Sequence, residues 1–128
     1  MRLLLDTHAL LWSMDDESRL GSTAHSLISD PANEVFVSIA SLWEIVIKTS
    51  IGKLKGDISS IDAAIDSQGF SRLDITLPHL QALALLPLYH RDPFDRMLIA
   101  QAQAEQLTFI TDDGHAPLYP VTILPCAA

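Results

Sequence analysis

Five short, mostly apolar runs, separated by segments with helical patterns, constrain the fold of this chain more than any other feature. The runs are RLLL (2–5), EVFVS (34–38), FSRLDI (70–75), LTFIT (107–111) and VTILP (121–125). Brief apolar runs of this kind are typical of strands buried on both faces of a sheet. The segments between them have the patterns and the Gly or Pro stops of helices, at 8–14, 21–29, 38–52, 58–68, 77–87 and 89–106. This alternation predicts an α/β fold with a parallel sheet covered by helices on both faces.

Length and composition favour one domain. The chain has 128 residues, 48% of them hydrophobic, which is enough for one packed core over residues 1–128. No apolar run approaches the roughly 18 residues that span a bilayer. The first residues lead straight into a strand candidate and lack signal-peptide organisation. Cys126 is the only cysteine and cannot form an internal disulfide. We therefore expect a cytoplasmic protein that does not contact a membrane.

The charge balance is acidic, which is unusual for a protein that binds nucleic acid. The chain has 16 acidic and 8 basic residues and a net charge of -8. Binding to phosphates then requires that several acids surround a cation and that bases lie near them. Five of the eight bases lie close in sequence to the candidate site segments: Lys48, Lys53, Lys55, Arg91 and Arg96. They are our candidates for phosphate contacts, with ordinary solvated surface charges as the alternative.

Two acidic positions directly follow strand candidates. Asp6 ends the first run, and Asp112 and Asp113 follow the fourth. In open parallel sheets, ligands bind beyond the carboxyl ends of the strands, where the strand order reverses. If the first and fourth strands are neighbours, these acids face one crevice. The alternative is that they are loop residues or helix caps.

A third candidate, Glu44, lies inside the apolar helical segment SLWEIVIK. Burying a carboxylate is costly unless it is paired or binds a metal. Its position among apolar residues favours a functional carboxylate that faces a cleft. Lys48 lies four residues later in the favourable order, so a simple surface ion pair is the alternative.

The segment from Asp92 to Asp95 combines a helix start with a fourth candidate acid. Asp92 before Pro93 has the pattern of an N-cap followed by the first helical residue. A cap needs only one good acceptor, so capping explains Asp95 less completely. Asp95 also lies at the positive end of the helix dipole, which favours an ionised carboxylate.

Together the acids predict a possible metal site. Asp6, Glu44, Asp95 and Asp113 repel one another if they converge without a cation, and carboxylates suit Mg²⁺ or Mn²⁺ better than zinc. Such a site can support hydrolysis at phosphorus. Hydroxyl groups beside the site, from Thr7 and Thr111 and less clearly from Ser38, can orient a carboxylate or a water, or simply cap strand ends. The histidines lack zinc-site spacing, and we interpret His8 and His90, near the cleft, as structural.

At this point the sequence resembles a known family. LLLDTHALLW (3–12), VSIASLWEIVIK (37–48) and HRDPFDRMLIAQAQAEQLTFITDD (90–113), followed by a short last strand, resemble PIN domains of the VapC-toxin kind in order and spacing. The resemblance places the family's catalytic, metal-binding acids at Asp6, Glu44, Asp95 and Asp113. It leaves Asp112 at a variable position and Asp92 in the DPFDR signature without a metal.

The resemblance implies a three-layer α/β/α sandwich with a parallel sheet of about five strands. It also implies Mg²⁺- or Mn²⁺-dependent endonucleolytic cleavage of RNA, a homodimer and a small antitoxin protein as partner. Two alternatives stay open: a PIN nuclease of RNA maturation or turnover that is not a toxin, and a non-catalytic acidic metal-binding module. A magnesium-dependent phosphatase is a weaker alternative, because Asp6-Thr7-His8 lacks that class's DxD pattern.

Overall fold

The structure, a computed structural model, describes residues 1–127. Its strands are β1 (Arg2–Leu5), β2 (Glu34–Ser38), β3 (Ser71–Leu73), β4 (Thr108–Ile110) and β5 (Ile123–Leu124). Its α-helices are α1 (Thr7–Asp15), α2 (Ser22–Ser29), α3 (Ile39–Ser50), α4 (Ile58–Gln68), α5 (Leu77–Leu85) and α6 (Pro93–Glu105). Two short 3-10 turns lie at Glu17–Arg19 and Ala116–Leu118. The predicted α/β fold is confirmed.

The strands form one parallel sheet in the order β3-β2-β1-β4-β5. β1 is central, and its Leu5 lies opposite Val37 of β2 and Ile110 of β4. From β1 the chain builds β2 and β3 on one side and then crosses to β4 and β5 on the other. The strand order therefore reverses between β1 and β4, and the adjacency that the acid argument required is present.

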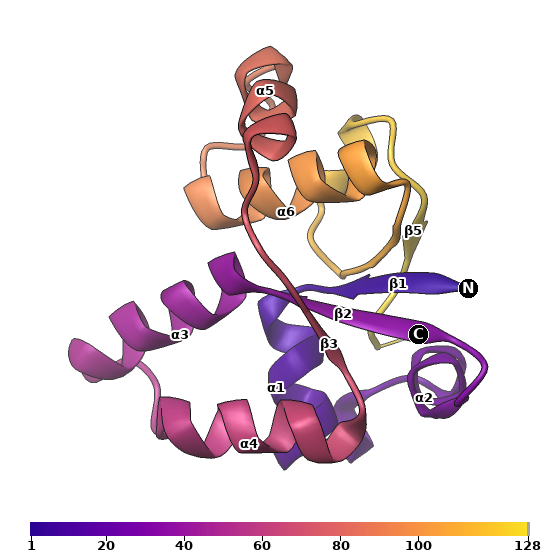
Figure 1. The fold of residues 1–128 in the computed structure, drawn as a ribbon, viewed down its shortest axis with the longest axis vertical. Helices are drawn as coiled ribbons and strands as arrows, with labels where there is room; N and C mark the ends of the chain where they lie inside the picture. The colour runs from indigo at the N-terminus through magenta and orange to yellow at the C-terminus, as the bar shows by residue number, and fades with distance from the viewer. Residues whose placement is uncertain (128) are drawn as a thin grey trace.

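Alternating side chains of the sheet fill two separate cores. Leu3 and Leu5 pack with Leu10 of α1 and Ile65 of α4 on one face. Leu4 packs with residues of α6 on the other face. Figure 1 shows the resulting layers, with α5 and α6 on one side of the sheet and α1, α2 and α4 on the other. Each fully buried leucine contributes roughly 1.5–3 kcal/mol, so this alternation fixes the register of β1.

Helix α3 contributes to both cores. Its Ala40 belongs to the cluster with α6, and its Ile45 to the cluster with α1 and α4. The helix therefore crosses the end of the sheet, where Figure 1 shows it extending away from β2. This position brings Glu44, on the second turn of α3, to the carboxyl end of β1.

Some element boundaries differ from the sequence-based prediction. The segment 89–106 forms a helix only from Pro93, because Asp92 caps the helix and Pro93 lacks the N–H that an earlier turn needs. Helix α3 ends at Ser50, and Gly52 follows with φ 76°, a conformation that glycine adopts without strain. The last strand shrinks to Ile123–Leu124 because it pairs only at the sheet edge with β4.

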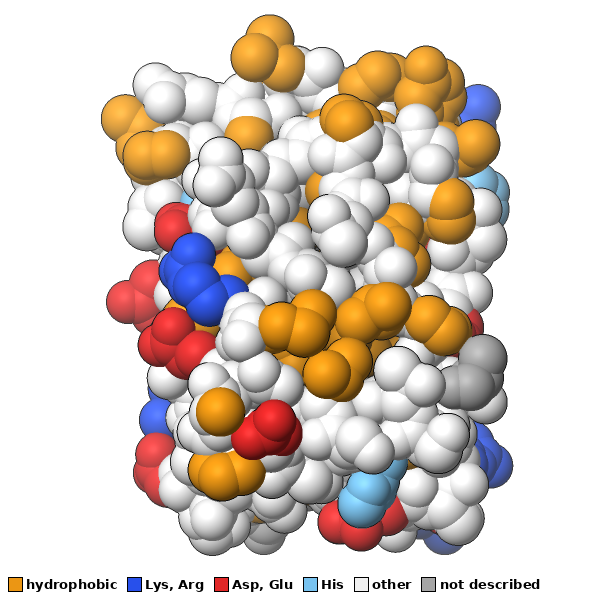
Figure 2. Space-filling model, turned by 90° about the vertical axis from the view of Figure 1, so that its right-hand side faces the viewer, with side chains coloured by type: hydrophobic (Ala, Val, Ile, Leu, Met, Phe, Trp, Pro, Cys, Tyr) orange, Lys and Arg blue, Asp and Glu red, His pale blue; other side chains and the backbone are white. Residues whose placement is uncertain are grey.

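The surface carries a number of exposed apolar side chains. On α5 and the loop after it, Leu80, Leu85, Leu88 and Tyr89 are all exposed, Leu85 by 85%. Figure 2 shows apolar side chains at the top of the molecule, the end that holds α5 in Figure 1, and a further group across the middle of this face. Among residues 1–127, no helix is long and apolar enough to cross a bilayer.

Candidate metal centre

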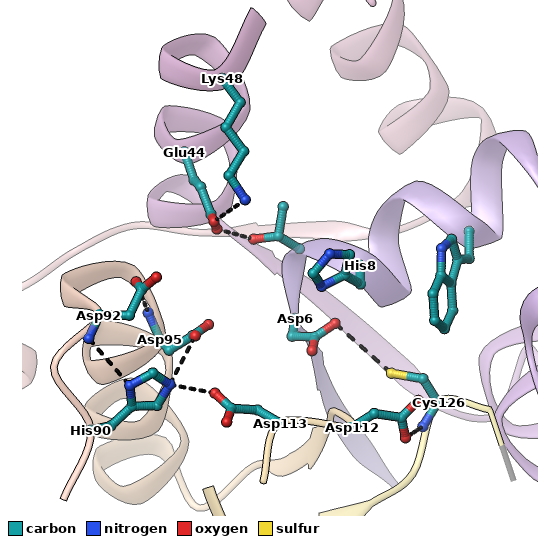
Figure 3. Close-up of a pocket in the computed structure, with 12 residues that line it drawn as sticks. Asp6, His8, Glu44, Lys48, His90, Asp92, Asp95, Asp112, Asp113 and Cys126 are labelled. Carbon is teal, nitrogen blue, oxygen red and sulfur yellow. Dashed lines mark hydrogen bonds and ion pairs between the residues drawn. The ribbon is translucent and has the colours of Figure 1, made fainter. Parts of the chain in front are cut away.

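A cavity of about 460 Å³ opens at the carboxyl ends of β1 and β4. It is lined by Asp6, Thr7, His8, Trp12, Glu44, Lys48, His90, Asp92, Asp95, Asp112, Asp113 and Cys126. The four predicted ligands all line it, and they come from four separate elements of the chain. Figure 3 shows the carboxylates of Asp6, Glu44, Asp95 and Asp113 around one space, whereas Asp112 points toward Cys126.

Asp6 and Asp113 are joined through one hydroxyl group. Thr111 Oγ1 donates to Asp6 Oδ2 at 2.7 Å and accepts from the Asp113 backbone N–H at 3.0 Å. Asp6 also caps α1, because its Oδ1 accepts from the Ala9 N–H at 2.7 Å. Burial raises the pKa of Asp6, although these hydrogen bonds oppose the rise. Thr111 thus fixes the two strand-end acids relative to each other.

Glu44 is held from two sides. Its Oε1 accepts from Thr7 Oγ1 at 2.6 Å, and its Oε2 pairs with Lys48 Nζ at 2.9 Å. Its side chain is only 9% exposed. The hydrogen bond to Glu44 raises the pKa of Lys48, which keeps this amine charged. Glu44 therefore pairs with Lys48 and lines the cavity at the same time.

The start of α6 places Asp95 and holds it by its backbone. Asp92 Oδ1 accepts from the N–H groups of Phe94 at 2.8 Å and Asp95 at 3.2 Å, so Asp92 is the N-cap that the sequence predicts. The Asp95 side chain is left free of capping and faces the cavity. Ser38 has a corresponding structural role at α3, where its hydroxyl accepts from the Ala40 N–H at 3.0 Å.

His90 lies between Asp95 and Asp113. Its Nε2 is 2.5 Å from Asp113 Oδ2 and 3.0 Å from Asp95 Oδ2. Burial and the charges of Asp92 and Asp113 raise the pKa of Asp95 to about 7. Burial acts in the same direction on Asp113, but hydrogen bonds from the His115 backbone N–H and from His90 lower the pKa of Asp113 overall. Of the two carboxylates, Asp113 therefore keeps its negative charge more readily, and Asp95 is the one that takes up a proton first.

The tautomer of His90 follows from its other nitrogen. The Asp92 backbone N–H donates to His90 Nδ1 at 3.2 Å, so Nδ1 is an acceptor and the proton of the neutral ring is on Nε2. His90 thus donates to the acids. The ligand atoms of His90, Asp113 and His115 lie within 4.8 Å of one another, a grouping that can hold a metal. Binding through Nε2 would require loss of that proton and of the Asp92 contact, so we interpret His90 as a donor.

This role of His90 was not predicted from the sequence. The sequence places His90 two residues before the helix cap, which accounts for its contact with Asp92. Its contact with Asp113 joins residues 23 positions apart on different elements, and no local pattern indicates it.

Of the residues predicted to contact phosphates, only some lie at or near the cavity. Lys48 is the one Lys or Arg that lines the cavity within residues 1–127. Arg91 is exposed in the loop before α6, and Lys53 and Lys55 are exposed in the loop after α3. Arg96 faces away, with Nη1 donating to the carbonyl oxygens of residues 87 and 90 at 3.0 and 3.2 Å. Arg96 therefore holds the loop that carries His90, and the structure does not bring it to the cavity.

Asp112 has a structural contact as well. Its carboxylate accepts from the backbone N–H groups of Cys126 at 2.8 Å and Ala127 at 3.1 Å. These bonds bring Cys126 against the cavity, where its Sγ is 3.8 Å from Asp6 Oδ1. Burial raises the pKa of the Cys126 thiol, so it stays protonated.

The comparisons with known proteins agree with this architecture. A family model described as "PIN domain" matches residues 3–119. The solved structure of VapBC2 from Rickettsia felis, bound to a promoter DNA fragment, contains a chain with a TM-score of 0.75 and 16% identity, covering 98% of this chain and 99% of that one. FitAcB from Neisseria gonorrhoeae gives a TM-score of 0.67 at 20% identity, covering 95% and 96%.

A third structure, VapBC-5 from Mycobacterium tuberculosis, gives a TM-score of 0.61 at 20% identity, covering 99% of this chain and 98% of that one. At these identities the likeness concerns the fold. No curated protein sequence shows significant similarity to this chain.

Proposed function

The chain belongs to the PIN-domain family, and from this premise we propose that it is a Mg²⁺- or Mn²⁺-dependent endoribonuclease with Asp6, Glu44, Asp95 and Asp113 as its catalytic, metal-binding acids. The observation that carries the proposal is their convergence on one open cavity from four separate elements. Members of this family are typically nucleases that bind divalent metal through acidic residues.

The donor set fits a hard divalent cation. The four side chains offer only carboxylate oxygens, which suit Mg²⁺ or Mn²⁺. Burial and the neighbouring acids raise the pKa of Asp95, so its negative charge is not fully offset by the groups around it. When bound, such an ion would neutralise charge on the phosphate and make a nearby water more acidic.

The protein's own groups hold this arrangement in place. Thr7 and Thr111 each donate a hydrogen bond to one acid, so they position carboxylates and do not need to touch RNA themselves. Lys48 lies at the cavity wall with its amine charged, and it is the best-placed residue for contacting a phosphate of the substrate. Arg91 is exposed beside the site and can add a second contact, whereas Arg96 is engaged with its own loop.

The test is cleavage of RNA by the purified protein, followed on gels that resolve internal fragments. We expect cleavage with Mg²⁺ or Mn²⁺, loss of cleavage with EDTA, and recovery when metal is returned. Either metal should also raise the melting temperature, because a ligand that binds only the folded state stabilises it. Cleavage that survives complete chelation would contradict the mechanism.

We further propose that the nuclease is the toxin of a toxin–antitoxin pair and acts in the cytoplasm. The solved complexes similar to this chain, VapBC2 and FitAcB, support a small protein partner. The alternatives are a nuclease of RNA maturation or turnover and a non-catalytic metal-binding module. Expression of the chain alone should arrest growth, and co-expression with the neighbouring small gene should restore it. Normal growth with full nuclease activity would favour the maturation or turnover role.

A homodimer is part of the same proposal. Trp43 of α3 and Ile51, the residue after this helix, are exposed by 58% and 60%, and α5 adds Leu80 and Leu85. Large exposed apolar side chains of this kind are typical of surfaces that bind another protein. Light scattering at micromolar concentration should give twice the mass of the chain, and a monomer at all concentrations would contradict the dimer.

A further inference from the structure

The cavity has a second half that the acids do not use. Beyond Asp6, its wall is formed by His8 and Trp12 of α1 and by Asp112 and Cys126. In Figure 3 His90, Asp92 and Asp95 lie to one side of Asp6, and His8 and Cys126 lie to the other. The four proposed metal ligands account for the first half only, and the second half is lined by two rings, a protonated thiol and the Asp112 carboxylate, which accepts from the backbone N–H groups of Cys126 and Ala127.

The two rings are adjacent and each is accessible. The centroids of His8 and Trp12 are 6.0 Å apart, and the ring planes are inclined by 44°. His8 is exposed and Trp12 is half-buried. Arg19, outside the cavity lining and paired with Asp16, lies over the Trp12 ring with its guanidinium carbon 5.8 Å from the centroid, so the other side of this ring is the one left for a ligand.

From these contacts we infer that His8 and Trp12 form a subsite for a nucleobase of single-stranded RNA, next to the phosphate at the acid cluster. The inference rests on the proposed nuclease function and specifies how its substrate is held. Unstacked bases bind proteins by stacking on aromatic side chains, and each such contact contributes about 1–3 kcal/mol. A flat aromatic ligand fits a wall of rings, whereas a metal or a phosphate does not.

The chain at the start of α1 connects this subsite directly to the acid cluster. Asp6, Thr7 and His8 are consecutive, and Thr7 donates to Glu44. Trp12 follows His8 by four residues and therefore lies one turn further along the same helix face. The rings are thus fixed relative to two of the four acids, and the cavity, at about 460 Å³, has the size of small-ligand sites. A nucleotide bound here has its phosphate toward the acids and its base toward the rings.

The two tryptophans allow a direct binding test. In a Trp43→Phe variant Trp12 is the only indole, and in a Trp12→Phe variant only Trp43 remains. Trp43 makes an edge contact with Phe94, which phenylalanine can keep. Each variant, with Ca²⁺ present, is titrated with the four 5′-mononucleotides and with ribose 5-phosphate. We expect at least one mononucleotide to quench Trp12 saturably, at least about tenfold more tightly than ribose 5-phosphate, and to leave Trp43 unchanged.

The kinetic arm uses the exposed ring. His8→Ala should raise KM for RNA by roughly tenfold, with kcat and the metal-induced rise in melting temperature nearly unchanged. His25→Ala, an exposed histidine on α2 outside the cavity, is the matched control and should change nothing.

The outcomes separate this inference from the proposed function. If RNA is cleaved but no mononucleotide affects Trp12 up to about 10 mM, the base subsite is wrong and the nuclease stands. Equal binding of ribose 5-phosphate and mononucleotides also overturns the subsite. If Trp12 reports base binding but RNA is never cleaved, the subsite stands and the nuclease proposal fails.

Discussion

At the start of α6, two aspartates three residues apart have different partners. Asp92 accepts two backbone N–H groups and completes the helix, whereas Asp95 faces His90 and the other acids. The sequence predicts the first role from the Asp-Pro pair alone, because capping is local. The sequence indicates a role for Asp95 in the site only because capping needs just one of the two aspartates. The partners of Asp95 come from other parts of the chain, so no local pattern identifies them.

Asp95→Asn tests the metal role at this residue. The change removes one of several repelling charges, so the metal-free protein should be as stable as before or more stable. RNA cleavage should fall by orders of magnitude, and the rise in melting temperature caused by Mg²⁺ should shrink. Wild-type cleavage with full metal stabilisation would remove Asp95 from the site.

Asp92→Ala is the matched change and should have the opposite effect. Loss of the N-cap should lower the free energy of unfolding by about 1 kcal/mol, measured by urea denaturation. Cleavage at a temperature where the variant is folded should stay within a few-fold of wild type, because Asp95 and Asp113 are intact. A complete loss of cleavage in folded Asp92→Ala would assign Asp92 a direct part in the site.

The raised pKa of Asp95 predicts a pH dependence with a definite sign. In the folded protein Asp95 titrates at about 7, above its ordinary value of 3.8. Between these values the folded state holds a proton that the unfolded state has lost, so this group's contribution to stability falls as pH rises through that window. A divalent metal and this proton compete for the Asp95 carboxylate. The metal-induced rise in melting temperature should therefore be larger near pH 8 than near pH 6, and an equal rise at both would contradict the assignment.

Among the elements, the contact between β1 and β4 assembles half of the site. The sequence predicts both strands and the acid that follows each, because buried runs and their ends are local patterns. The adjacency of the strands depends on packing across the whole chain, so the sequence leaves it open. The same limit applies to Arg96, whose nearest acceptors are loop carbonyls that only the folded structure brings together.

Thr111→Val tests how this strand contact holds the acids. The variant keeps the shape and the strand preference of residue 111 but leaves buried Asp6 Oδ2 without its 2.7 Å donor. We expect a loss of about 1–3 kcal/mol in the free energy of unfolding and weaker metal binding in calorimetry. Thr108→Val, at the opposite end of β4, is the control and should change stability by no more than about 0.5 kcal/mol. Equal effects of the two changes would show that the Thr111 hydroxyl has no special role.

For the whole molecule, the central question is how a protein this acidic would bind RNA, as the proposed function requires. The net charge of -8 repels phosphates, and Lys48 is the one Lys or Arg lining the cavity within residues 1–127. The composition alone indicates this conflict, whereas the proposed resolution, a cation held by four acids, depends on the fold. Binding should then rely on the metal and on base contacts more than on a basic surface.

This balance predicts a shallow salt dependence. For single strands, log K falls with log salt by about 0.7 for each phosphate neutralised, so one to three protein cations give a slope between roughly -0.7 and -2. Fluorescence anisotropy with a labelled RNA at fixed Ca²⁺ measures this slope. Lys48→Gln should make it shallower by about 0.7, whereas Lys55→Gln, in the exposed loop after α3, should leave it unchanged. A slope of about -4 or steeper would mean that RNA binds along a basic surface elsewhere on the protein. The cavity with the four acids would then contribute only a minor part of the binding free energy.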